Sequence, residues 1–136
     1  MFRTDGKRPN GLSLIPWQSG KSLLWDVTVA DTLAVSHLAT TSRTAGGAAE
    51  STGDKKDSKY RELASSHIFV PIACETMGPL NSKAHTFLAD LGRRITAISG
   101  DPREGAFLFQ RISVTIQRFN CVCFKGSFSF PNDLEE

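Results

Sequence analysis

Two short runs with alternating apolar residues open the chain. The first covers residues 12–17 and the second covers residues 23–29. A polar stretch, Gln-Ser-Gly-Lys at 18–21, separates them, and its Gly20 can adopt the positive φ of a tight hairpin turn. The pattern therefore predicts a β-hairpin over residues 12–29.

The second run contains a single carboxylate, Asp26, among apolar residues. Side chains of a strand alternate between its two faces, which places Trp25, Val27 and Val29 together on one face. Asp26 then belongs to the opposite face. We therefore expect Asp26 to point away from the deepest apolar face of the hairpin.

The middle of the chain, residues 30–66, has few apolar side chains. A weak helix is predicted at 32–41. The stretch "TAGGAAESTGDKKDSKY" that follows soon after is rich in glycine, serine, threonine and charge. Each glycine inside a helix costs about 1 kcal/mol. We therefore expect a mobile segment or a poorly held helix here, with order returning near Tyr60.

A third strand and a long helix follow. Residues 67–76 are rich in β-branched and aromatic side chains, and Pro71 among them predicts a bulge or an edge position. Apolar residues then recur at helical spacing over 82–99. Asn81 or the residue after it would cap this helix, and Gly100 would end it.

The last long element has two possible structures. Asp101, Pro102 and Glu104 resemble a helix start with a capping box, and an apolar stripe continues over 102–123. The segment "RISVTI" within it is also typical of a strand. The cap and the stripe favour the helix. The order strand, strand, weak helix, strand, helix, helix predicts a mixed α/β (α+β) fold.

Composition sets broad limits on function. The chain has 136 residues, enough for one domain, and its net charge of +2 gives little support to nucleic-acid binding. No apolar run predicts a membrane span. The three cysteines cannot all pair internally, and the N-terminus lacks a signal-peptide pattern. We expect an intracellular protein, nuclear or cytoplasmic, that is not secreted.

Three short motifs occur in a fixed order: "RPN" at 8–10, "DVT" at 26–28 and "KDSKY" at 56–60. This set resembles the restriction-like endonuclease domain of sequence-specific non-LTR retrotransposons, which belongs to the PD-(D/E)xK superfamily. The family pattern is Lys/Arg-Pro-Asp, then the Asp of a DVT strand, then a displaced lysine before a tyrosine. The resemblance implies a partial restriction-endonuclease-like domain at 5–126, with its leading helix missing, and an irregular tail at 127–136.

The resemblance also implies a catalytic site. In such enzymes, carboxylates hold Mg²⁺ and a lysine offsets charge at the scissile phosphate of DNA. Asp26 and Asn10 would take the metal positions here, and Lys56 or Lys59 would be the lysine. A reverse transcriptase would lie upstream in the parent element. Positively charged side chains are the implied DNA contacts: Arg8, Lys56, Lys59, Arg93 and Arg94.

One departure from the family pattern weakens this site. Asn10 stands where the family has Asp, so the site loses one negative charge, and hard cations prefer carboxylates. Glu75 would be either a further acid near the metal or the exposed end of its strand. We expect an endonuclease-like domain with impaired or absent catalysis. The alternatives are a remnant that binds nucleic acid or protein without cutting, and a relic reading frame without selected function.

Overall fold

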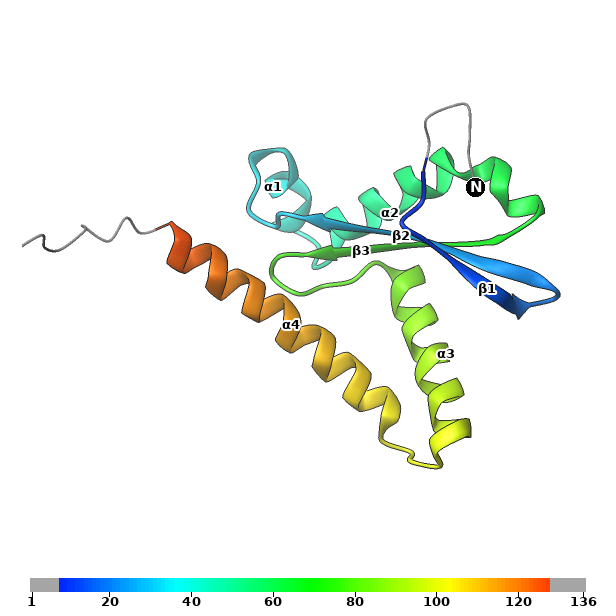
Figure 1. Cartoon of the computed structure of the whole chain (residues 1–136). Coiled ribbons are helices and arrows are strands. Elements are labelled where there is room, and N and C mark those ends of the chain that lie inside the picture. Colours follow the sequence, from blue (N-terminus) through cyan, green and yellow to red (C-terminus); the bar gives the residue numbers. More distant parts are fainter. Residues whose placement is uncertain (1–7, 128–136) are drawn as a thin grey trace, which may run out of the picture.

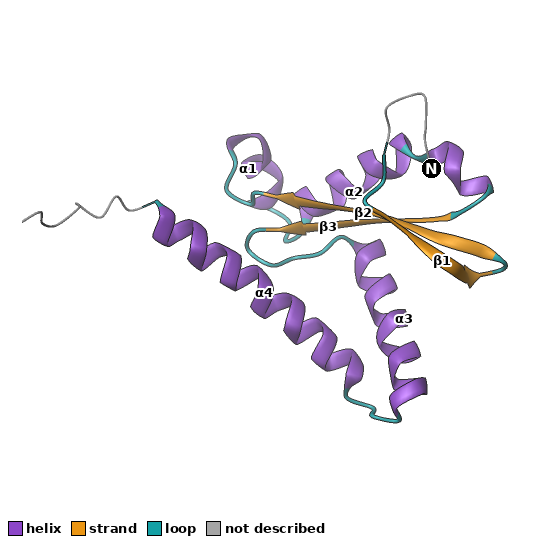
Figure 2. Cartoon of the chain, viewed as in Figure 1, coloured by secondary structure: helices purple, strands orange, loops and turns teal. Residues whose placement is uncertain are grey.

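The computed structural model describes residues 8–127, which form a three-stranded mixed sheet with helices on both sides (Figures 1 and 2). The strand order is β1-β2-β3, with β1 antiparallel and β3 parallel to β2. The predicted boundary at residue 5 and the predicted tail at 127–136, except for Ser127, lie outside the described residues. The elements are β1 (Gly11–Gln18), β2 (Lys21–Ala30), α1 (Val35–Thr41), α2 (Gly47–Lys59), a short 3₁₀ helix (Arg61–Ser65), β3 (Ile68–Glu75), α3 (Ser82–Ser99) and α4 (Glu104–Gly126).

The predicted hairpin is confirmed. Ser19 and Gly20 form its turn with φ values of 50° and 71°, the left-handed conformation that a tight two-residue turn requires. Register irregularities on both sides of Pro16 show where β1 departs from a regular ladder. β1 and β2 therefore pair as the alternating pattern indicated.

The predicted orientation of Asp26 is wrong. Its side chain lies on the buried face and is 4% exposed, whereas Val27 and Val29 on the other face are 49% and 62% exposed. Leu24, two residues before Asp26, packs with Tyr60 and Leu63 in the core, with Phe69 against them. The face with fewer apolar residues is buried because α2 covers it.

The glycine-rich middle forms a helix that packs on the sheet, so the expectation of a poorly held segment is wrong. The residues of α2 that face the sheet are small, and Ala48, Ala49 and Gly53 are buried. Glu75, from β3, anchors the start of this helix. Its Oε1 accepts hydrogen bonds from the backbone N–H groups of Ala48 and Ala49 at 2.9 and 3.2 Å. Close packing and this carboxylate hold a helix that has little hydrophobic character of its own.

Asn81 seals the outer edge of β3. Its Oδ1 accepts from the backbone N–H of Ala73, and its Nδ2 donates to the carbonyl of Pro71, both at 2.9 Å. The backbone N–H of Asn81 donates to the carbonyl of Ala73 at 3.0 Å. The predicted edge position of Pro71 is therefore confirmed, because its missing N–H falls on the side of β3 away from β2.

Gly53 of α2 packs directly against Asn81, and this contact leads to a prediction. A Cβ at Gly53 would lie 2.6 Å from Asn81 Nδ2, whereas a Cβ at Gly105, in α4, meets nothing within 4 Å. We expect Gly53→Ala to destabilise the fold by about 1–3 kcal/mol through overpacking. Gly105→Ala, the matched control, should stabilise it by about 0.5–1 kcal/mol through helix propensity. Urea unfolding measures both, and equal effects would contradict the close approach.

Helix α3 matches its predicted bounds and ends at Gly100 with φ of 77°. Its predicted cap is only half right, because the Asn81 side chain binds β3 instead. Glu50, from α2, does the capping: its carboxylate accepts from the backbone N–H and the hydroxyl of Ser82 at 2.8 and 2.7 Å. These two hydrogen bonds hold the pKa of Glu50 below its usual value.

The last element is a helix, α4, as the stripe and the cap predicted over the competing strand. Its start contacts α3, where a Cβ on Gly92 would lie 2.7 Å from the Cα of Gly105. Near its end, Asn120 Nδ2 donates to the carbonyl of Thr76 at 2.6 Å. The Asp101 side chain accepts from Arg103 and not from Glu104, so the predicted capping box is not formed. Every helix within residues 8–127 is too short or too polar to cross a bilayer.

Candidate functional site

Asp26 and Lys56 meet between the sheet and α2. The Lys56 ammonium lies 2.7 Å from Asp26 Oδ2, and the two side chains are 27% and 5% exposed. Lys56 reaches this position because it continues the sheet-facing stripe of α2, which runs from Ala49 through Gly53 to Lys56 and on to Tyr60. Two of the three predicted catalytic motifs thus come together in space.

The Asp26 carboxylate remains incompletely satisfied. Its Oδ2 is the one buried side-chain oxygen or nitrogen within residues 8–127 that has no hydrogen-bond partner. Lys56 is close enough, but its direction of approach falls outside hydrogen-bond geometry, so the contact is an ion pair. A buried carboxylate is costly unless it is paired, and Lys56 supplies the compensating charge. The oxygen keeps spare capacity to accept a hydrogen bond.

Asn10 has a structural role next to this pair. Its Oδ1 accepts a hydrogen bond from the backbone N–H of Val27 at 2.5 Å. The backbone pairing of β1 with β2 ends at Gly11. The Asn10 side chain adds one further hydrogen bond to β2 beyond that point. The oxygen that would ligate a metal is therefore already engaged one residue from Asp26 along the strand.

The other predicted positive charges are divided between regions. Arg8 and Lys59 are exposed, and the Lys59 ammonium lies 5.2 Å from the centre of the Tyr60 ring. Arg93 and Arg94 lie on α3, on the opposite side of the sheet from α2 (Figure 1). The structure therefore brings Lys56 to Asp26 and places the two arginines at a separate surface.

The described residues do not fit a magnesium ion as they stand. Within residues 8–127, no group of three His, Cys, Asp or Glu side chains is placed to hold a metal. Asp26 supplies one carboxylate and is neutralised by Lys56, while Mg²⁺ prefers several hard oxygen ligands. Burial raises the pKa of the Cys74 thiol, which disfavours the thiolate that soft metals bind.

Glu75 is neither the strand's exposed end nor a spare acid. It is 1% exposed, so the expectation of an exposed end is wrong. Its Oε1 binds the start of α2, and its Oε2 accepts from the Thr32 hydroxyl at 3.2 Å. The period-two pattern of β3 is the signal that could have placed Glu75 on the buried face with Ala73.

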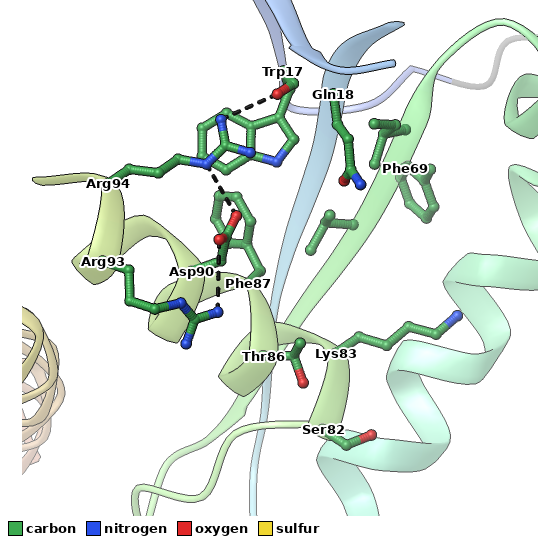
Figure 3. Close-up of a pocket in the computed structure, with 12 residues that line it drawn as sticks. Trp17, Gln18, Phe69, Ser82, Lys83, Thr86, Phe87, Asp90, Arg93 and Arg94 are labelled. Atoms are coloured by element: carbon green, nitrogen blue, oxygen red, sulfur yellow. Dashed lines mark hydrogen bonds and ion pairs between the residues drawn. The ribbon is translucent and has the colours of Figure 1, made fainter. Parts of the chain in front are cut away.

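Sequence reasoning missed a second polar cluster, which α3 forms with the end of β1. The Arg94 guanidinium lies 3.7 Å from the centre of the Trp17 ring and donates to the Trp17 carbonyl at 3.1 Å. Asp90 accepts from Arg94 Nε at 3.1 Å (Figure 3). The adjacent arginines at 93–94 were the available signal, but nothing in the sequence pairs them with Trp17.

Comparison of the chain with protein-family models, with curated proteins and with solved structures gives no match. The geometry of the chain itself offers a buried acid–lysine pair on one side of the sheet and an aromatic–arginine cluster on the other. The first of these corresponds to the predicted catalytic motifs.

Proposed function

We propose that this chain is a nuclease-like domain of retroelement origin that engages DNA and whose catalysis is impaired. The contact between Asp26 and Lys56 carries the proposal. These residues come from different motifs and different elements, and a carboxylate close to a lysine is one part of the arrangement that metal-dependent phosphodiester cleavage uses. The mixed sheet with helices on both faces is compatible with a restriction-endonuclease-like core.

In an intact site of this class, Mg²⁺ would offset the charge that develops on the phosphate and would activate the attacking water. Asp26 occupies the position of the metal-facing carboxylate in that pattern, and Lys56 occupies the position of the lysine at the scissile phosphate. In this chain the two side chains pair with each other instead. Asn10 contributes no charge, and its oxygen is held by Val27. The reaction in intact relatives would be cleavage of one DNA strand to prime reverse transcription.

A second candidate is a remnant that binds nucleic acid without cutting it. The pairing of Lys56 with Asp26 favours this function, because the pair neutralises the acid at the predicted metal position. Such a remnant would bind DNA equally well with and without Mg²⁺. A relic without selected function would show neither binding nor cleavage.

The test is Asn10→Asp, which keeps an oxygen to accept from Val27 and adds the missing charge. We expect the unaltered chain to nick supercoiled plasmid poorly or not at all with Mg²⁺. Asn10→Asp should increase nicking, by roughly 10²-fold if it restores one electrostatic group of the site. Mn²⁺, which tolerates less ideal ligands, should reveal the same ranking.

The control is Asn10→Asp combined with Asp26→Ala, which should abolish the gain. Circular dichroism establishes that each variant is folded. Strong nicking by the unaltered chain that persists in Asp26→Ala would show that the catalytic assignment is wrong. Folded Asn10→Asp protein that gains no nicking but binds DNA independently of Mg²⁺ would favour the binding remnant.

A further inference from the structure

A pocket of about 610 Å³ lies between the end of β1, the start of β3 and residues 82–94 of α3 (Figure 3). Its lining combines aromatic rings with charged side chains. Trp17 and Phe87 form a wall in which their ring centres are 5.5 Å apart. A pocket of this size accommodates a small organic ligand or one residue of a polymer.

The aromatic wall is held in place by Arg94. Its guanidinium lies over the Trp17 ring and is fixed by the Trp17 carbonyl and by Asp90. Because the Nε and one Nη of Arg94 each donate a hydrogen bond, the guanidinium is fixed against the Trp17 ring. A flat ring that enters the pocket would contact a preformed aromatic surface. The protein would therefore lose little conformational entropy on binding it.

The charge of the pocket favours an anion. Three cationic side chains line it, Lys83, Arg93 and Arg94, against the carboxylate of Asp90. Arg93 is 70% exposed and lies 3.6 Å from Asp90, a looser contact than that of Arg94. Lys83 is 56% exposed and forms an ion pair with Asp57 of α2. Arg93 and Lys83 can therefore turn toward a bound phosphate.

We propose that this pocket binds an unpaired nucleotide of a single-stranded nucleic acid. The base would stack on the Trp17–Phe87 wall, and the flanking phosphate would contact Arg93 and Lys83. Stacking on aromatic side chains beside positive charge is how single strands are bound without sequence preference. A base inside a duplex is already stacked and cannot enter.

This inference rests on the proposed function, in which the chain engages DNA. The pocket and the acid–lysine pair are linked through consecutive residues of α2. Lys56 contacts Asp26, and Asp57 contacts Lys83 at the pocket. A DNA strand that is separated from its partner near Asp26 and Lys56 could therefore place an unpaired base in the pocket.

The test is fluorescence anisotropy of labelled oligo-dT and of a duplex of equal length, with the whole chain. We expect the single strand to bind more tightly. Phe87→Leu should weaken oligo-dT binding by about tenfold, in line with the contribution of one stacked base. Arg93→Gln should weaken it by roughly threefold to tenfold, because it removes a phosphate contact. Arg43→Gln, which removes the same charge from an exposed position outside the pocket lining, should change it less than twofold.

Trp17 supplies a second readout. In a Trp25→Phe background it is the sole tryptophan, and oligo-dT should quench its fluorescence. Equal weakening by Arg93→Gln and Arg43→Gln would overturn the proposal, as would binding of thymidine monophosphate more tightly than oligo-dT. Both tests are independent of plasmid nicking. If the pocket variants bind oligo-dT like the unaltered chain while Asn10→Asp gains nicking, the pocket proposal alone is refuted. If the pocket variants weaken oligo-dT binding but Asn10→Asp gains no nicking, the nuclease assignment alone is refuted.

Discussion

Lys56→Met should lower the free energy of unfolding by about 3 kcal/mol, because it leaves the buried Asp26 carboxylate without a compensating charge. Breaking a buried pair from one side costs roughly 3–5 kcal/mol, and the partial exposure of Lys56 favours the lower end of that range. The measurement is urea unfolding followed by circular dichroism.

Lys55→Met is the matched control, because Lys55 is the exposed neighbour of Lys56 on the same helix. It should change the free energy of unfolding by less than about 0.5 kcal/mol. Combining Lys56→Met with Asp26→Asn should recover much of the loss, since no buried charge then remains. Equal effects of Lys55→Met and Lys56→Met would show that the pair is not energetically coupled.

Glu75→Ala should be more damaging still and should lower the free energy of unfolding by about 4 kcal/mol, because hydrogen bonds to a charged acceptor contribute roughly 1.5–3 kcal/mol each and do not add fully. The substitution removes the acceptor of two N–H groups at the start of α2 and of the Thr32 hydroxyl. It also removes a negative charge from the positive end of the helix dipole. Circular dichroism should show lost helix signal in parallel.

Two controls separate these contributions. Glu75→Gln keeps an acceptor oxygen but loses the charge, so it should cost about half as much as Glu75→Ala. Glu104→Ala removes an acid from the first turn of α4, and it should cost less than about 1 kcal/mol. A loss below about 1 kcal/mol for Glu75→Ala would contradict the anchoring role.

Elements specified by local signals could be predicted from the sequence. The turn at Gly20 and the helix stop at Gly100 depend on conformations that glycine adopts readily, and both are at the expected positions. Helix α2 was mispredicted because its buried stripe is built from alanine and glycine around Lys56. These residues lack large apolar side chains and so give no strong helical stripe. Close packing compensates for their small apolar surface.

The same limit applies to the candidate site. The ordered motifs singled out Asp26 and Lys56, but the face of Asp26 was predicted wrongly, because the more apolar side of a strand was taken as the buried one. The assumption fails when a small-residue helix covers the other face and brings a lysine to the acid. The contact between Trp17 and Arg94 joins residues that are far apart in the sequence. The spacing of residues along one strand or helix cannot predict such a contact.

The hydrogen bonds along the outer edge of β3 also affect whether a strand from another molecule can pair with this sheet. Exposed edge strands recruit further strands and are a common starting point for aggregation. Along Pro71–Glu75 the outward backbone groups are occupied: Pro71 has no N–H, Ala73 is bound by Asn81, and the N–H of Glu75 donates to the carbonyl of Pro79. A strand from another molecule would find no free N–H along this stretch, so intermolecular sheet extension is disfavoured at this part of the β3 edge.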